Sequence, residues 1–135
     1  MSERKVYKVF KVGLDGLESC VVFPKELRVV YKPNEWAEGY RGTPLLAFSN
    51  EKDARRFVER SLIPSARYEI WECKAEGVQD DVPWVLYHPV FGDDVVRFWN
   101  GKYRRVAMAP PPRGTVACKR VKPVRLVEKV EPLPF

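Results

Sequence analysis

Histidine and cysteine are scarce in this chain, and their scarcity excludes whole classes of site. Among 135 residues there are one histidine, His88, and three cysteines, Cys20, Cys73 and Cys118. The cysteines lie far apart, with no Cys-x-x-Cys pair, whereas a structural zinc site needs four ligands that usually come in close pairs. We therefore expect no metal and no cofactor. An odd number of cysteines also argues against a disulfide framework, so all three are predicted to be small buried strand residues.

The motifs of common enzymes are missing as well. The sequence has no glycine-rich phosphate loop and no G-x-S-x-G nucleophile turn. His88 is the one candidate for a histidine base, and its Tyr-His-Pro context favours a structural turn. Glu69 and Glu72 lie on opposite faces of a predicted strand, and either could be a catalytic acid. Catalytic residues therefore stay unknown at this point, and so does the question of whether the protein is an enzyme.

Long apolar runs and amide side chains are also rare. No run approaches the roughly 18 residues that span a bilayer, so no membrane partner is expected. The N-terminus has no apolar signal core, which predicts a cytoplasmic protein. Few Asn and Gln, abundant charge and 12 prolines are typical of thermophile proteins, although GC-biased codon usage gives a similar skew.

The remaining composition is that of one folded domain. A chain of 135 residues that is 45% hydrophobic and 31% charged can bury a core as a single domain, 1–135, with an extended Pro-rich tail at 131–135. Segments rich in valine and aromatic residues, bounded by glycine and proline, predict short strands. These segments are 5–12, 17–23, 27–31, 45–48, 67–75, 115–121 and 124–130.

One segment carries the pattern of an amphipathic helix. Apolar residues at helical spacing, Ala54, Phe57, Val58 and Leu62, predict a helix over residues 50–62 with Phe57 buried against a sheet. Asn50 and Asp53 have the spacing of a capping box at its start. Many short strands with one main helix predict an α+β fold, mostly antiparallel, with the helix packed on the sheet.

The dipeptide Asn100-Gly101 predicts a β-hairpin. It joins two β-prone segments, 95–99 and 102–106, and Asn-Gly is the preferred pair of a two-residue type I′ turn. In such a hairpin Arg97, Trp99, Lys102 and Arg104 share one face. Because like charges that face each other destabilise a strand pair, an anion or the nearby carboxylates of residues 93–94 would have to offset this cluster.

Charge is distributed unevenly along the chain. Residues 1–99 hold 15 basic and 16 acidic residues, whereas residues 100–135 hold 9 basic and 2 acidic residues. Such asymmetry is typical of a surface that binds a polyanion, most often nucleic acid. The hairpin residues Arg97, Trp99, Lys102 and Arg104 are the predicted nucleic-acid-binding site, because a basic ribbon with an aromatic residue can follow phosphates and stack a base. A thermophile-like surface would also be rich in lysine and arginine.

A loop without periodicity, residues 32–44, is long enough to be functional. It contains Trp36 and Tyr40, which either fix the loop to the core or stack on a ligand.

A weak resemblance covers the first half of the chain. The residues Tyr7-Lys8-Val9, Leu17-Glu18-Ser19-Cys20, Tyr31, Trp36, Gly42, Leu46-Ala47-Phe48-Ser49 and Tyr68-Glu69-Ile70 occur in an order that resembles small phage and prokaryotic domains. Some of those domains are thought to be similar to the ADP-ribosyltransferase fold. The resemblance spans residues 5–75 and implies a viral or prokaryotic origin and a transferase-like site, to which Tyr7 and Glu69 can be fitted.

Three functional hypotheses therefore stand after the sequence alone. The first is binding of nucleic acid or another polyanion through the basic C-terminal strands. The second is an ADP-ribosyltransferase-like enzyme domain, active or degenerate, that uses the loop at 32–44. The third is a protein–protein adaptor that docks by a sheet edge or by the tail. Oligomeric state is left open.

Overall fold

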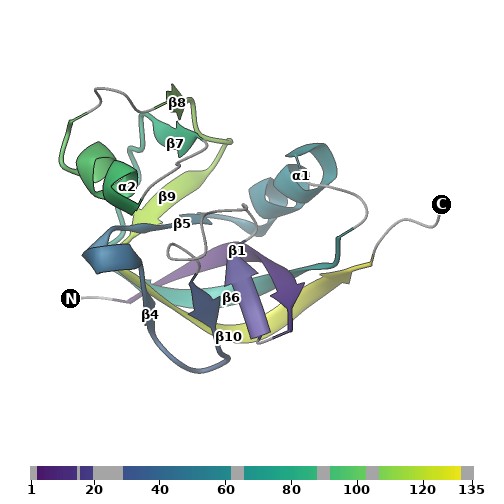
Figure 1. Cartoon of the computed structure of the whole chain (residues 1–135). Coiled ribbons are helices and arrows are strands. Elements are labelled where there is room, and N and C mark those ends of the chain that lie inside the picture. Colours follow the sequence, from purple (N-terminus) through teal and green to yellow (C-terminus); the bar gives the residue numbers. More distant parts are fainter. Residues whose placement is uncertain are drawn as a thin grey trace.

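The protein has the predicted α+β architecture, a mostly antiparallel sheet with one main helix (Figure 1). The computed structural model describes residues 3–14, 16–19, 29–61, 66–87, 92–102 and 107–131. The strands are β1 (Arg4–Gly13), β2 (Gly16–Ser19), β3 (Val30–Tyr31), β4 (Ala37–Glu38), β5 (Leu45–Phe48), β6 (Tyr68–Glu76), β7 (Val85–Tyr87), β8 (Ala107–Ala109), β9 (Thr115–Cys118) and β10 (Arg120–Val130). The helices are α1 (Glu51–Ser61), α2 (Gly92–Trp99) and the short 3₁₀ helix η2 (Tyr40–Gly42).

Strand β6 is the centre of the larger sheet. It pairs with β1 on one edge and with β10 on the other, and the sheet order is β3-β2-β1-β6-β10-β4. Strand β5 pairs with both β1 and β9, and β9 runs into β10 through Lys119. Strand pairing therefore runs from β10 through β6, β1 and β5 to β9. Because Lys119 connects β9 directly to β10 along the chain, this open sheet curves around its inner face. Strands β7 and β8 form a separate pair.

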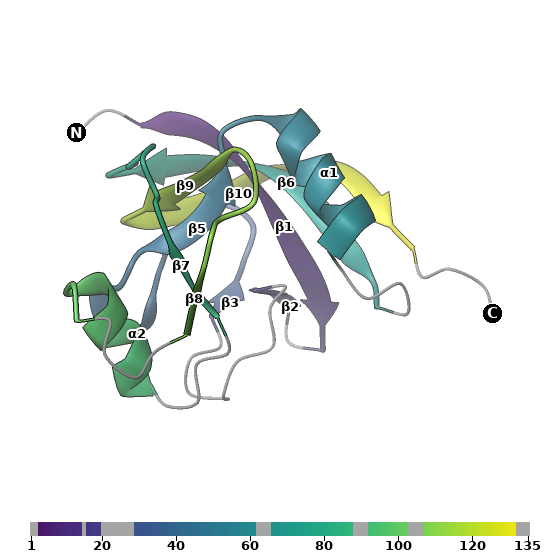
Figure 2. The same cartoon turned by 90° about the horizontal axis from the view of Figure 1, so that it is seen from above.

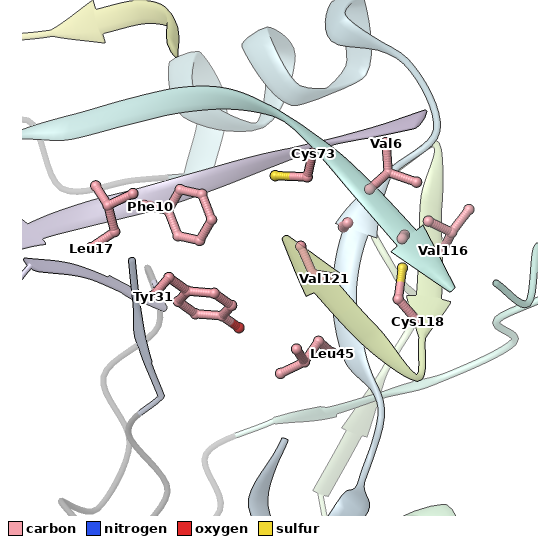
Figure 3. Close-up of a cluster of buried hydrophobic side chains, with 11 residues drawn as sticks. Val6, Phe10, Leu17, Tyr31, Leu45, Cys73, Val116, Cys118 and Val121 are labelled. Atoms are coloured by element: carbon pink, nitrogen blue, oxygen red, sulfur yellow. The ribbon is translucent and has the colours of Figure 1, made fainter. Parts of the chain in front are cut away.

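The inner face of this curved sheet holds the main core (Figure 3). Figure 3 shows side chains from β1, β6, β9 and β10 meeting there, with the ring of Tyr31 beside that of Phe10 at 4.7 Å between centroids.

Cys73 and Cys118 belong to this cluster as free thiols, and the structure does not describe Cys20. Burial raises the pKa of the Cys73 thiol to about 12 and that of Cys118 to about 11. Both thiols are therefore protonated at neutral pH.

Helix α1 covers one end of the outer face, as its apolar stripe predicts. Ala54 is fully buried against Val9 and Ile70. The Asn50 Oδ1 accepts a hydrogen bond from the Asp53 amide at 2.9 Å, which caps the helix as expected. Phe57 was predicted to be buried and is only partly buried, because it packs at the margin of the cluster. Its ring lies beside that of Phe48, with 5.3 Å between centroids. Leu62 lies outside the described residues.

The predicted hairpin at Asn100-Gly101 is wrong, because the residues before it form helix α2. The amide of Gly101 donates to the Phe98 carbonyl at 3.1 Å, and the amide of Lys102 donates to the Arg97 carbonyl at 2.8 Å. Together with a φ of 78° at Gly101, these two bonds define a Schellman helix end. Asn-Gly suits both motifs, since each needs a glycine at positive φ. Figure 2 shows α2 at the opposite end of the molecule from α1.

Strand β10 is longer than predicted. Pro123 was expected to separate two strands, but the break falls at Lys119 and Pro123 lies inside β10. A register shift between Pro123 and Arg125 accommodates the proline, whose carbonyl accepts a hydrogen bond from the Asn34 amide at 2.7 Å. The predicted tail beyond Glu131 lies outside the described residues. In the part of the chain that is described, neither helix is both long and apolar enough to cross a bilayer.

The backbone angles of Asn100 and Gly101 distinguish a helix C-terminus from a hairpin. A type I′ turn needs positive φ at both residues, whereas here Gly101 has positive φ and Asn100 does not. We expect Gly101→Ala to cost about 1 kcal/mol of unfolding free energy and Asn100→Ala to stay within about 0.5 kcal/mol. Urea denaturation measures both. A comparable loss for the two variants would contradict the helix end.

Candidate nucleic-acid interface

Arg97 and Trp99, two of the residues predicted to bind nucleic acid, do not share one face. Arg97 is exposed and Trp99 is half-buried near the end of α2, where its ring meets Phe98 edge-on at 5.0 Å. Residues two apart in a helix point in directions about 200° apart, so the flat ribbon face that the sequence predicts is absent here. Lys102 is exposed just after the helix, and Arg104 lies outside the described residues.

A different set of basic residues lies in a line across the sheet. On the outer face, Lys5 of β1 is directly opposite Lys74 of β6, and Lys74 is directly opposite Lys122 of β10. We call these three residues the lysine row. Because neighbouring strands lie about 4.8 Å apart, the row spans about 10 Å. The Lys5 and Lys74 side chains are 63% and 51% exposed. Like charges that face each other destabilise a strand pair, so the row requires nearby anions, either carboxylates of the protein or groups of a ligand.

Trp36 continues the lysine row on the next strand. Strand β4 pairs with β10 at Ala37 and Glu38, which places Trp36 beside Lys122. The Lys122 Nζ lies 4.9 Å from the centroid of the Trp36 ring, and the Arg120 guanidinium carbon lies 4.3 Å from it. Both distances are those of cation–π contacts. Trp36 therefore packs on basic side chains of β10, and a half-buried aromatic ring stands at the end of a line of ammonium groups.

The arginines around the row are paired with carboxylates. Arg120 donates to Glu76 at 2.7 Å, and Arg125 donates to Glu72 at 2.9 Å. These hydrogen bonds are the main reason that the pKa values of both carboxyl groups are lowered from the ordinary value. Two of the nine basic residues of the C-terminal region are therefore paired with carboxylates of strand β6.

The three lysines differ in their pairing. The Lys5 Nζ lies 3.8 Å from Glu72, which it shares with Arg125, and the Lys74 Nζ lies 3.7 Å from Glu3. Within the described residues Lys122 has no carboxylate at ion-pair distance, and its ammonium group lies over the ring of Trp36. Lys122 is accordingly the position in the row with the most unneutralised charge.

Features that would support an enzyme are weaker. Tyr7 is directly opposite Glu72, and Phe10 is directly opposite Glu69, so Tyr7 and Glu69 lie on opposite faces of the sheet and form no common site. The Glu69 carboxylate accepts a hydrogen bond from the Trp71 indole at 2.9 Å. His88 lies outside the described residues, among which no three His, Cys, Asp or Glu side chains are grouped as metal ligands.

A shallow groove of about 630 Å³ lies between residues 79–83 and 111–115. Its lining is rich in proline, and its Asp80 carboxylate pairs with Arg4 at 2.7 Å. The exposed Asp81 and Arg113 are its other charged residues. This lining offers no nucleophile with a neighbouring base, so the groove does not support a catalytic site.

Comparison of the chain with protein-family models, with curated proteins and with solved structures found no match. The resemblance to ADP-ribosyltransferase-like domains stays a prediction.

Sequence patterns did not predict that Lys5, Lys74, Lys122 and Trp36 lie side by side on the sheet. Each residue lies in a different segment, and only the long-range strand register brings them together. The nearest sequence signal was the loop at 32–44, in which Trp36 was one of two candidates for stacking.

The acidic partners of this face generate a pH prediction. Above its ordinary pKa, the Glu76 carboxylate contributes stability through Arg120, and that contribution is lost as the pH falls through its lowered pKa. We expect Arg120→Gln to raise the Glu76 pKa toward the ordinary value of 4.5. Carboxyl NMR titration measures the shift, and Arg125→Gln is the control, because it should move Glu72 and leave Glu76 in place. An unchanged Glu76 titration in Arg120→Gln would disprove the pairing.

Proposed function

We propose that the protein binds nucleic acid through the outer face of β1, β6 and β10, with the lysine row as the phosphate-contacting element. The observation that carries the proposal is the direct register of Lys5, Lys74 and Lys122 across three adjacent strands. Aligned ammonium groups can each contact a phosphate and release a condensed counterion, which supplies most of the free energy of non-specific binding. A cytoplasmic location is part of this proposal.

The charge balance of the face limits what kind of binding is expected. Around the row, the cations Lys5, Lys74, Arg120, Lys122 and Arg125 stand among the carboxylates Glu3, Glu38, Glu72 and Glu76. The long-range field is therefore weak, and affinity must come from local contacts within about a Debye length, 10 Å at 0.1 M salt. Binding of this kind is modest and weakens as the salt concentration rises.

The competing location for the same function is the end of α2. Arg97 and Lys102 are both exposed there, and they belong to the site that the sequence predicts. No strand pairing aligns the basic residues of that surface, because they lie on a helix and the turn that follows it. Matched variants at the two surfaces distinguish them.

Charge removal at the lysine row should weaken binding and its salt dependence together. We expect the double variant Lys74→Gln/Lys122→Gln to reduce the log–log salt slope by about 1.4 on single strands, because two phosphate contacts are lost. The control Arg97→Gln/Lys102→Gln removes the same charge from α2 and its turn and should leave the slope unchanged. Fluorescence anisotropy with labelled mixed-sequence oligonucleotides, from low to physiological salt, measures both, and circular dichroism checks folding.

Two outcomes would contradict the proposal. A wild-type dissociation constant weaker than about 0.1 mM at low salt would lie at the weak limit of ordinary non-specific affinity, and nucleic-acid binding should then be abandoned. Loss of binding in the α2 variant with full binding in the lysine-row variant would move the function to the predicted residues Arg97 and Lys102.

A further inference from the structure

The position of Trp36 at the end of the lysine row suggests the form of the nucleic acid. Resting on the proposed function, we infer that the ligand is single-stranded and crosses the strands along the lysine row, with one unpaired base stacked on Trp36. The strand register sets this direction, since Lys5, Lys74, Lys122 and Trp36 follow one another on β1, β6, β10 and the residue before β4.

Stacking requires a base whose face is accessible. In a duplex, each base face is covered by its neighbours, so an aromatic ring beside a phosphate-contacting row acts mainly on unpaired bases. Duplex readers instead place a helix or a two-stranded ribbon in the major groove. The lysine row lies on the strands of the sheet itself, and α1 covers the other end of the outer face, at Val9 and Ile70.

The ring of Trp36 is fixed before any ligand arrives. Arg120 lies 4.3 Å from the ring centroid, and the guanidinium is itself held by Glu76 at 2.7 Å. A side chain that is already ordered loses less conformational entropy on binding. Arg120 is therefore a positioning residue for Trp36, and Lys122 is the phosphate contact nearest to the stacked base.

The length of the row gives the size of the contact. Three lysines over about 10 Å, followed by the aromatic ring, allow at most three phosphates and one stacked base. Sequence preference is expected to be weak, because every base has a face that can stack.

A probe without bases separates stacking from charge. We would measure binding of the wild-type protein to a 12-residue oligo(dT), to an abasic 12-residue strand with the same phosphates, and to a duplex of equal length. Loss of one stacked base should weaken binding by about 5- to 150-fold, so oligo(dT) should bind that much more tightly than the abasic strand. The duplex should behave like the abasic strand.

Tryptophan variants test whether the ring of Trp36 causes the preference for oligo(dT) over the abasic strand. Trp36→Leu should bind oligo(dT) and the abasic strand equally, with a salt slope close to that of the wild type. The control Trp84→Leu removes a tryptophan that is 44% exposed elsewhere and should keep the preference. If Trp36→Leu does not fold, Trp36→Phe, with its smaller ring, should show a reduced preference.

The outcomes distinguish this inference from the proposed function. Equal wild-type binding to all three probes, still dependent on Lys74 and Lys122, would overturn single-strand stacking and leave a phosphate-binding surface. A preference for oligo(dT) that survives in Trp36→Leu would also overturn the inference. Absence of binding to every probe would overturn the proposed function, and the inference with it.

Discussion

The double pairing of strand β6 is the constraint on which the rest of the structure depends. Its antiparallel register with β1 and β10 directs Cys73 and Ala75 into the core and Lys74 and Glu76 to the outside. Side chains alternate between the two faces of a strand, so a slip of one residue would bury a lysine and a glutamate and expose the core. The same register that forms the core therefore also aligns the lysine row, and the candidate site is a consequence of how the core is built.

Strand β1 shows how one sequence pattern serves both faces. Its lysines at positions 5, 8 and 11 are three residues apart, so successive lysines lie on opposite faces of the strand. Lys8 is the one on the inner face, with Val6 and Phe10. The Lys8 side chain is only 8% exposed, its Nζ donates to the Leu46 carbonyl, and the rings of Phe10 and Tyr31 lie 5.8 and 5.4 Å away. Carbonyl and cation–π contacts partly compensate the loss of hydration of a buried ammonium group. The number of lysines in the sequence is therefore larger than the number of ammonium groups exposed on the surface.

Local signals in the sequence were sufficient for much of the fold. Helix α1 has its apolar stripe and its Asn50 cap within one short segment, and strands β1, β5 and β6 have valine-rich or apolar segments bounded by turn residues. Asn100-Gly101 was ambiguous, because the same glycine conformation ends a helix or turns a hairpin, and burial of Phe98 accompanies the helix. The lysine row could not be predicted, because three strands distant in sequence must first adopt one register.

The account depends most on whether a ligand contacts this outer face. Heteronuclear NMR of the 15.7 kDa chain can locate the contact during titration with a short single-stranded oligonucleotide. We expect the largest shifts at the backbone amides of Lys5, Lys74 and Lys122 and at the indole N–H of Trp36, with the amides of Arg97, Trp99 and Lys102 unchanged. Shifts confined to the end of α2, or to the groove beside Asp80, would contradict the account.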